Sequence, residues 1–301
     1  MIYNVINQVL VLFLMMAVGI YARKKGFINK EINGGLSNIL LNICFPLLII
    51  SSFNIEFNKE MMDNSIKIFL FTVLISIVLI ILGNLFFFKI NERQGTILKF
   101  GLVFSNCSFM GYPILNQVLG SKGIFYGSIF TMVFNLFAFT YGVMLFTGEK
   151  NLKGLKKALI NPNILAVFIG FFIFVFSVKF PYPISRTMSL VGSMTTPLSM
   201  LILGAMISEM NIKEVFLGNK VYYSLIARLI VAPLITLIIL KLFGASDIVI
   251  KVITIAEAMP VASNTAVFAG QYKGDEALAS RCVFVTTAFS ILTIPFIISL
   301  I

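Results

Sequence analysis

Long apolar runs alternate with short polar segments along the whole chain. A helix needs about 20 mostly apolar residues to cross roughly 30 Å of hydrocarbon. Ten runs meet this requirement, and we predict membrane-spanning helices at residues 4–22, 36–52, 66–88, 100–119, 123–147, 163–180, 187–208, 221–243, 249–270 and 277–300. The predicted fold class is therefore an all-α polytopic membrane protein with ten transmembrane helices.

The composition supports a membrane protein, and this affects how the positive net charge is interpreted. Of the 301 residues, 59% are hydrophobic and 12% are charged, whereas soluble domains have about 45–50% apolar and about 25% charged residues. The net charge of +11 would point to nucleic acid in a soluble protein, but basic residues between apolar runs report topology instead. We expect the lipid bilayer as a partner and no nucleic-acid partner.

The distribution of Lys and Arg predicts the orientation of the chain. If the N-terminus lies outside, 14 basic residues fall in cytoplasmic loops and 7 fall outside, as the positive-inside rule requires. The 14 cytoplasmic residues are Arg23, Lys24, Lys25, Lys30, Lys89, Arg93, Lys99, Lys150, Lys153, Lys156, Lys157, Lys213, Lys220 and Lys273. We predict a multi-pass protein of the cell membrane with the N-terminus and the C-terminus outside.

The two halves of the chain resemble each other when the sequence is shifted by 151 residues. The shift aligns Pro46 with Pro197, each in the second span of its half. We predict a first five-helix repeat at residues 1–150 and a second at 151–301. Because each repeat has an odd number of spans, the second begins on the opposite side of the membrane. The repeats are therefore inverted, as in many secondary transporters.

Two predicted spans contain helix breakers midway along their length. Span four reads SNCSFMGYPIL from Ser105, and span nine reads AEAMPVASNTAVFA from Ala256. An unpaired backbone group is costly in lipid, so such breaks need protein or a water-filled cavity around them. We predict that both helices unwind, near Met110–Pro113 and Met259–Ser263, and cross, so that half-helix N-termini create an anion site. The alternative is two continuous helices that proline kinks.

These stretches resemble a known family. FPLLIISSF in span two, SNCSFMGYPIL in span four, NPNILAVFIG entering span six, TTPLSMLILGAMI in span seven and AMPVASNTAVFAGQY in span nine are similar to segments of the auxin efflux carrier family. This family includes plant auxin exporters and bacterial carriers of malate, malonate and other organic acids. The short connection at residues 148–162 is typical of a bacterial member.

The resemblance implies a fold and a function. It implies ten spans in two inverted repeats, a scaffold domain and a transport domain, and an elevator-like motion. It also implies a homodimer. The function it implies is secondary transport of a small carboxylate substrate by alternating access, with binding near the crossover of helices 4 and 9.

The resemblance also implies where the carboxylate binds. Asn106 matches the asparagine that the family uses near the crossover, where a neutral amide donates hydrogen bonds to a carboxylate. Asn264 lies about one helical turn beyond Pro260 and is expected to face the same cavity. The alternative is that these amides satisfy freed backbone groups. The full set of candidate substrate-binding residues is Asn106, Pro113, Pro260, Asn264, Ser105, Ser263 and Asn42.

Glu257 is the candidate residue for energy coupling. It follows Asp247 by ten residues, which corresponds to about 15 Å along a helix and a position close to the membrane midplane. A carboxylate at that depth is costly and marks a functional site by default. One hypothesis is that Glu257 carries a proton coupled to transport. The other is a structural ion pair with Arg228 of span eight.

Other classes of function fit the sequence less well. A sodium-coupled symporter of the bile-acid type shares the crossed-helix plan but needs more oxygen ligands near the crossover. An intramembrane enzyme is disfavoured, because the chain has no His, no paired intramembrane Asp and no Gly-rich phosphate loop beside Lys. A ligand-sensing receptor would need an output domain. We expect no enzymatic activity, no cofactor and no metal, since Cys44, Cys107 and Cys282 lack metal-ligand spacing.

Overall fold

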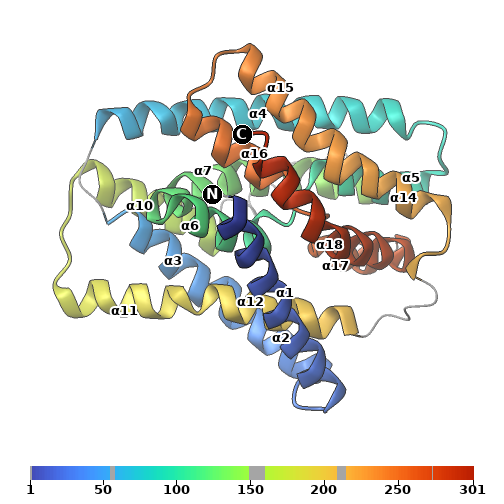
Figure 1. The fold of residues 1–301 in the computed structure, drawn as a ribbon, viewed down its shortest axis with the longest axis horizontal. Coiled ribbons are helices and arrows are strands. Elements are labelled where there is room, and N and C mark those ends of the chain that lie inside the picture. The colour runs from blue at the N-terminus through green and yellow to red at the C-terminus, as the bar shows by residue number, and fades with distance from the viewer. Residues whose placement is uncertain (1, 55–57, 149–159, 209–214, 273) are drawn as a thin grey trace.

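The fold is built from helices throughout the part of the chain that the structure describes (Figure 1). The computed structural model describes residues 2–54, 58–148, 160–208, 215–272 and 274–301. The predicted junction of the repeats, at residues 150 and 151, lies outside these ranges. Six of the loop lysines used for the topology also lie outside them, namely Lys150, Lys153, Lys156, Lys157, Lys213 and Lys273.

The helices follow the predicted spans in order. In the first half these are α1 (Ile2–Lys24), α2 (Lys30–Ile39) with η1 (Leu40–Cys44) and α3 (Phe45–Ser52), α4 (Lys59–Phe86), α5 (Glu92–Val103), η2 (Cys107–Gly111) with α6 (Tyr112–Leu119), and α7 (Ser121–Phe137) with η3 (Ala138–Gly142) and α8 (Val143–Thr147). In the second half these are α10 (Pro162–Val175), α11 (Tyr182–Ser193) with α12 (Thr195–Ser208), α14 (Asn219–Ile226) with η4 (Ala227–Val231) and α15 (Ala232–Leu242), α16 (Asp247–Glu257), α17 (Asn264–Gln271) and α18 (Glu276–Ile298). The η segments are π-helical turns.

Several of these helices are long and apolar enough to cross a bilayer. Among the described residues, six helical stretches meet that requirement: Lys30–Ser52, Lys59–Phe86, Ser121–Thr147, Tyr182–Ser208, Asn219–Leu242 and Glu276–Ile298. The other predicted spans coincide with α1, with the interrupted pairs α5/α6 and α16/α17, and with α10, which has 14 residues. The prediction of an all-helical polytopic membrane protein is confirmed.

Most helix contacts fall within two groups, which also meet each other where α1 contacts α18 and α3 contacts α7. In the first group, α1 lies along α12, and α3 contacts both α10 and α11. In the second group, α4 contacts α5, α7 and α16, while α18 contacts α14 and α17. Figure 1 shows α11 and α12 along one side of the molecule and α4 along the opposite side, with α3, α6 and α7 between them.

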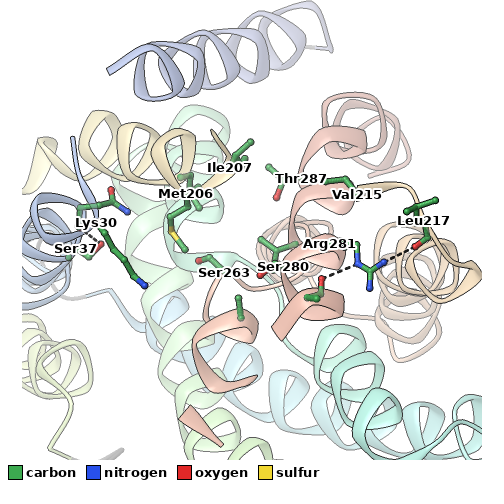
Figure 2. Close-up of a pocket in the computed structure, with 16 residues that line it drawn as sticks. Lys30, Ser37, Met206, Ile207, Val215, Leu217, Ser263, Ser280, Arg281 and Thr287 are labelled. Carbon is green, nitrogen blue, oxygen red and sulfur yellow. Dashed lines mark hydrogen bonds between the residues drawn. The ribbon is translucent and has the colours of Figure 1, made fainter. Parts of the chain in front are cut away.

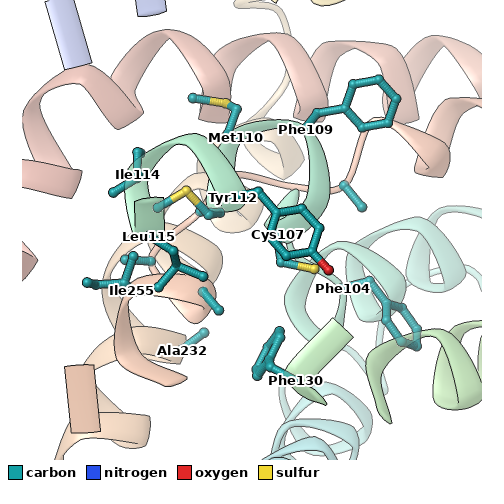
Figure 3. Packing of buried hydrophobic residues seen from close by; sticks show 14 of the residues in the cluster. Phe104, Cys107, Phe109, Met110, Tyr112, Ile114, Leu115, Phe130, Ala232 and Ile255 are labelled. Atoms are coloured by element: carbon teal, nitrogen blue, oxygen red, sulfur yellow. The ribbon is translucent and has the colours of Figure 1, made fainter. Parts of the chain in front are cut away.

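Buried apolar side chains surround α6 at the centre of the molecule. Figure 3 shows Tyr112 and Leu115 of α6 together with Phe130 of α7, Ala232 of α15 and Ile255 of α16. All five side chains are buried. Because this packing encloses the first turn of α6, the polar interruption that precedes it is shielded from lipid, as intramembrane irregular backbone requires.

Glycine lets α1 and α12 approach closely. A Cβ atom at Gly204 of α12 would lie 2.0 Å from the carbonyl oxygen of Met16, and one at Gly19 of α1 would lie 2.3 Å from that of Leu201. Small residues at helix contacts allow this kind of backbone approach in membranes, where packing contributes much of the association energy. The close contact therefore depends on the absence of side chains at both positions.

We expect Gly204→Ala to destabilise the protein. The added methyl group collides with the α1 backbone, and forcing the helices apart should cost about 1–3 kcal/mol. Gly35→Ala in α2 is the matched control, because a Cβ there meets nothing within 4 Å. Melting temperature in detergent measures the difference. Equal melting temperatures for the two variants would contradict the close α1–α12 contact.

The interruption of span four lies earlier than the sequence predicts. We expected it near Met110–Pro113, but helix η2 already begins at Cys107 and continues into α6, so the break falls at residues 104–106. Pro113 is tolerated in the first turn of α6. The carbonyl four residues before it, that of Phe109, accepts a hydrogen bond from the Ser199 hydroxyl of α12 at 3.1 Å. A tertiary contact thus compensates for the proline.

Candidate substrate site at two interrupted helices

The two interruptions lie against each other and exchange backbone hydrogen bonds. The Asn106 N–H donates to the Pro260 carbonyl at 2.7 Å, and the Ala262 N–H donates to the Phe104 carbonyl at 3.0 Å. Ser105 and Val261 thereby form an antiparallel bridge. This pairing satisfies the polar groups that unwinding releases, which a buried backbone requires.

A small polar cavity adjoins the bridge. Its volume is about 190 Å³, below the roughly 300–1,000 Å³ of pockets for drug-sized ligands. Its polar lining comes from Asn42, Ser105, Asn106, Ser108, Asn135, Asn161, Asn163, Ser263 and Asn264. None of the described residues that line it is charged. A ligand here would meet amides and hydroxyls, not lysine or arginine.

The structure brings together five of the seven predicted substrate-binding residues. These five are Asn42, Ser105, Asn106, Ser263 and Asn264, from four separate elements or loops. The two prolines do not line the cavity. Pro260 lies in the interruption before α17 and supplies the carbonyl that accepts from Asn106. Pro113 is buried within α6. The two prolines therefore determine the course of the backbone at the interruptions and do not form part of the cavity lining.

Asn106 and Ser105 carry buried polar atoms without hydrogen-bond partners among the described residues. These atoms are Nδ2 of Asn106 and Oγ of Ser105, in side chains of residues that are 3% and 1% exposed. Buried polar groups are rarely left unpaired in native proteins, because each one costs about 1–3 kcal/mol. An unpaired amide donor beside a cavity is a suitable partner for a ligand with an acceptor oxygen.

Two helix N-termini meet at the same cavity. Asn106 immediately precedes η2 and α6, and Ser263 immediately precedes α17, whose first residue is Asn264. The first N–H groups of a helix have no partner within the helix, and the dipole adds partial positive charge. The cavity therefore favours an anion although its described lining has no cationic side chain.

Three asparagines of the cavity were not among the predicted site residues. Asn135 lies in α7, and Asn161 and Asn163 lie at the start of α10. The Asn161 side chain accepts a hydrogen bond from the Asn163 N–H at 2.9 Å. Asn135 could have been predicted as a site residue, because it is a polar residue within an apolar span. Asn161 and Asn163 were visible within the stretch NPNILAVFIG, but only the fold brings α10 beside the interruptions.

Two larger cavities lie at opposite ends of the helices around the site. One, of about 720 Å³, is lined by Lys30 at the start of α2 and by Arg281 in the first turns of α18. The other, of about 450 Å³, is lined by Ser52 at the end of α3 and by Arg186 of α11. Because α2–α3 runs from the first cavity to the second, the two cavities lie at opposite ends of that helix.

The small polar cavity adjoins the larger cavity of 720 Å³. Ser263 lines both of them. Figure 2 shows Ser263 in the lining of the larger cavity, together with Met206 and Ile207 of α12. In the same lining, Arg281 is held by hydrogen bonds, one of them to the Leu217 carbonyl at 3.1 Å. A ligand entering past Lys30 and Arg281 would reach the interruptions at Ser263.

Aromatic side chains lie between the small cavity and the cavity of 450 Å³. Phe109 lines the former, and Tyr112 lines the latter. The ring of Phe45 in α3 contacts both, with centroid distances of 5.8 Å to Phe109 and 5.6 Å to Tyr112. The polar site thus shares the lining residue Ser263 with one large cavity, whereas these three rings lie between it and the other.

Arg228 and Glu257 form a buried ion pair outside the lining of the small cavity. Nη2 of Arg228 donates to Oε2 of Glu257, and the two residues are 0% and 2% exposed. For Glu257 we considered an ion pair with Arg228 and a proton coupled to transport. The structure contains the ion pair, and the coupled proton stays a hypothesis. Neither residue lines the cavity of the asparagines.

These features define a class of protein. Helices apolar enough to span a membrane, a central polar cavity and two interrupted helices that meet beside it are characteristic of membrane transporters. A family model described as "Membrane transport protein" matches residues 4–154 and 147–298. The chain belongs to this family, the auxin efflux carrier family, as the sequence motifs predicted.

Curated relatives cover most of the chain. An uncharacterized transporter of Methanocaldococcus jannaschii is 27% identical over 96% of this chain and 96% of its own length. An uncharacterized transporter of Methanothermobacter thermautotrophicus is 23% identical over 96% of both chains. A Rhizobium meliloti protein with the name "Putative malonate transporter" is 23% identical over 76% of this chain and 74% of its own length.

Proposed function

We propose that the chain is a secondary transporter of small carboxylates that binds its substrate in the asparagine-lined cavity. The observation that carries the proposal is the Asn106 amide, whose buried Nδ2 has no partner among the described residues. A carboxylate has acceptor oxygens only, and hydrogen bonds to a charged acceptor are stronger than neutral ones. The two helix N-termini supply the compensating partial charge.

The chemistry of the cavity supports a small anion that is held reversibly. Amides and hydroxyls bind a carboxylate without a full opposite charge, so the complex is weak enough to release its ligand. The cavity volume of about 190 Å³ suits a short mono- or dicarboxylate. The name of the Rhizobium meliloti relative makes malonate the first probe to use.

The arrangement of cavities supports alternating access. One large cavity adjoins the site at Ser263, whereas Phe45, Phe109 and Tyr112 lie between the site and the other cavity. We infer ten spans in two inverted repeats, with the helices interrupted at residues 104–106 and 258–263 crossing near the midplane. The group that contains α1, α3 and α12 would be the scaffold, and the group with the interrupted helices would move as an elevator. The inferred assembly is a homodimer with both termini outside.

Asn106→Ala is expected to weaken malonate binding about 5- to 150-fold. Removing the amide leaves a charged oxygen short of one donor, which costs about 1–3 kcal/mol. Folding should survive, because the amide Nδ2 makes no hydrogen bond to a described residue. Isothermal titration and proteoliposome uptake of malonate measure the effect.

Asn84→Ala is the matched control. Asn84 is an exposed asparagine of α4 that donates to the Ile80 carbonyl at 3.0 Å and lines none of the three cavities described above. The Asn84→Ala protein should bind malonate with the affinity of the wild type. If a well-folded Asn106→Ala protein keeps wild-type affinity for every short carboxylate that binds, Asn106 is a packing residue and the proposed site is wrong.

A further inference from the structure

Arg228 makes an unusual set of contacts for an intramembrane arginine. Its Nη1 donates to the carbonyl oxygens of Leu102 at 2.6 Å and Val103 at 3.5 Å, and its Nε donates to that of Met259 at 3.1 Å. Its Nη2 donates to both the carbonyl and the side chain of Glu257. One guanidinium thus holds four backbone carbonyls and one carboxylate.

Those carbonyls belong to the ends of the two interrupted helices. Leu102 and Val103 are the last residues of α5, Glu257 is the last residue of α16, and Met259 follows it in the interruption. The C-terminal end of a helix carries partial negative charge and carbonyls without intrahelical partners. Two such ends therefore converge on one point and need a positive charge there.

In transporters with discontinuous helices, a bound sodium ion or proton commonly takes that place. Unwound carbonyls and half-helix C-terminal ends are the usual ligands of a coupling ion. Here the guanidinium fills the position. Arg228 is fully buried and is the largest of the fully buried side chains in the described residues. It comes from η4, an element outside both interrupted helices, so the charge is tethered to the chain.

We propose that Arg228 is a built-in cation that replaces a dissociable metal ion at the two helix ends, so that the chain binds and moves its substrate without sodium or another metal cation. The inference rests on the proposed function only in that the chain is a transporter with interrupted helices. It assigns Arg228 a positioning role: the residue fixes the two half-helix ends and does not touch the substrate. It also opposes the sodium-coupled symporter of the bile-acid type.

The test begins with the wild-type protein, which needs no variant to fold. Its melting temperature, and its malonate uptake in proteoliposomes, should be unchanged when sodium chloride is replaced by potassium or choline chloride at equal ionic strength. A sodium-specific rise in melting temperature or in uptake would overturn the proposal. Because the melting temperature requires no substrate, a failure of malonate transport and a failure of cation independence are distinguishable.

Chemical rescue tests the role of the side chain. Arg228→Ala should lower the melting temperature by about 5–10 °C. Guanidinium chloride at millimolar concentration should restore much of that loss with a saturable dose dependence, because the free ion replaces the missing group. Arg93→Ala is the control: Arg93 is exposed and also donates to one carbonyl, that of Gly274, at 2.9 Å.

The two variants should respond differently. A rescue that saturates in Arg228→Ala and is absent in Arg93→Ala supports a cation site built from the helix ends. An equal response of both variants, or no response of a folded Arg228→Ala, would overturn it. If Arg228→Ala fails to fold, Arg228→Lys retains a cation with fewer donors and should fold with a lowered melting temperature that sodium does not raise. A sodium-dependent Arg228→Lys would count against a tethered charge.

Discussion

Arg228→Met is expected to lower the free energy of unfolding by about 5 kcal/mol or more. The change removes the partner of a buried carboxylate, Glu257, and an uncompensated buried charge costs about 3–5 kcal/mol. It also leaves four carbonyls at the ends of α5 and α16 without their donor, and an unsatisfied buried acceptor costs about 1–3 kcal/mol. Methionine preserves most of the volume, so the loss is electrostatic.

The melting temperature of purified protein in detergent measures this loss. Arg93→Met is the control, since its exposed guanidinium has one carbonyl partner and should shift the melting temperature little. A stable Arg228→Met protein would mean that water or a solution cation satisfies the helix ends. That result would also argue against the tethered charge.

Glu257→Gln is expected to destabilise the protein by about 3 kcal/mol, the lower end of the cost of breaking a buried pair. Glutamine keeps the shape and still offers an acceptor oxygen to Arg228. The guanidinium keeps its four carbonyl partners, which offset part of its charge. We therefore expect a smaller loss than for Arg228→Met, and the order of the two melting temperatures is the first measurement.

The same variant tests the proton hypothesis. If Glu257 serves only as the partner of Arg228, Glu257→Gln is destabilised, and the uptake that remains follows pH as in the wild type. A stable variant whose proteoliposome uptake no longer depends on pH would favour a coupling proton on Glu257. These two outcomes require melting temperature and pH-dependent uptake on the same preparation.

The double variant Glu257→Gln with Arg228→Met distinguishes a simple pair from a network. If the two residues only neutralised each other, removing both charges would restore stability, because no buried charge remains. Here the four carbonyls still lack their donor, so the double variant should stay well below the wild type. Full restoration would contradict the role of Arg228 at the helix ends.

The sequence by itself determined the features that depend on local composition. Runs of apolar residues predicted helices in the membrane, and breakers in spans four and nine predicted two interrupted helices. The motifs also led to the family, and the resemblance to that family made Asn106 a candidate substrate-binding residue.

The tertiary structure decided which groups meet. Pro113 suggested a break near itself, yet the Ser199 hydroxyl of α12 satisfies the carbonyl of Phe109, and the break lies at residues 104–106 instead. Asn161 and Asn163 join the cavity because α10 lies beside the interruptions, a contact between residues distant in the chain. For Arg228, charge and depth indicated an ion pair, but backbone carbonyls are the same in every residue. Only the fold could show that four of them converge on its guanidinium.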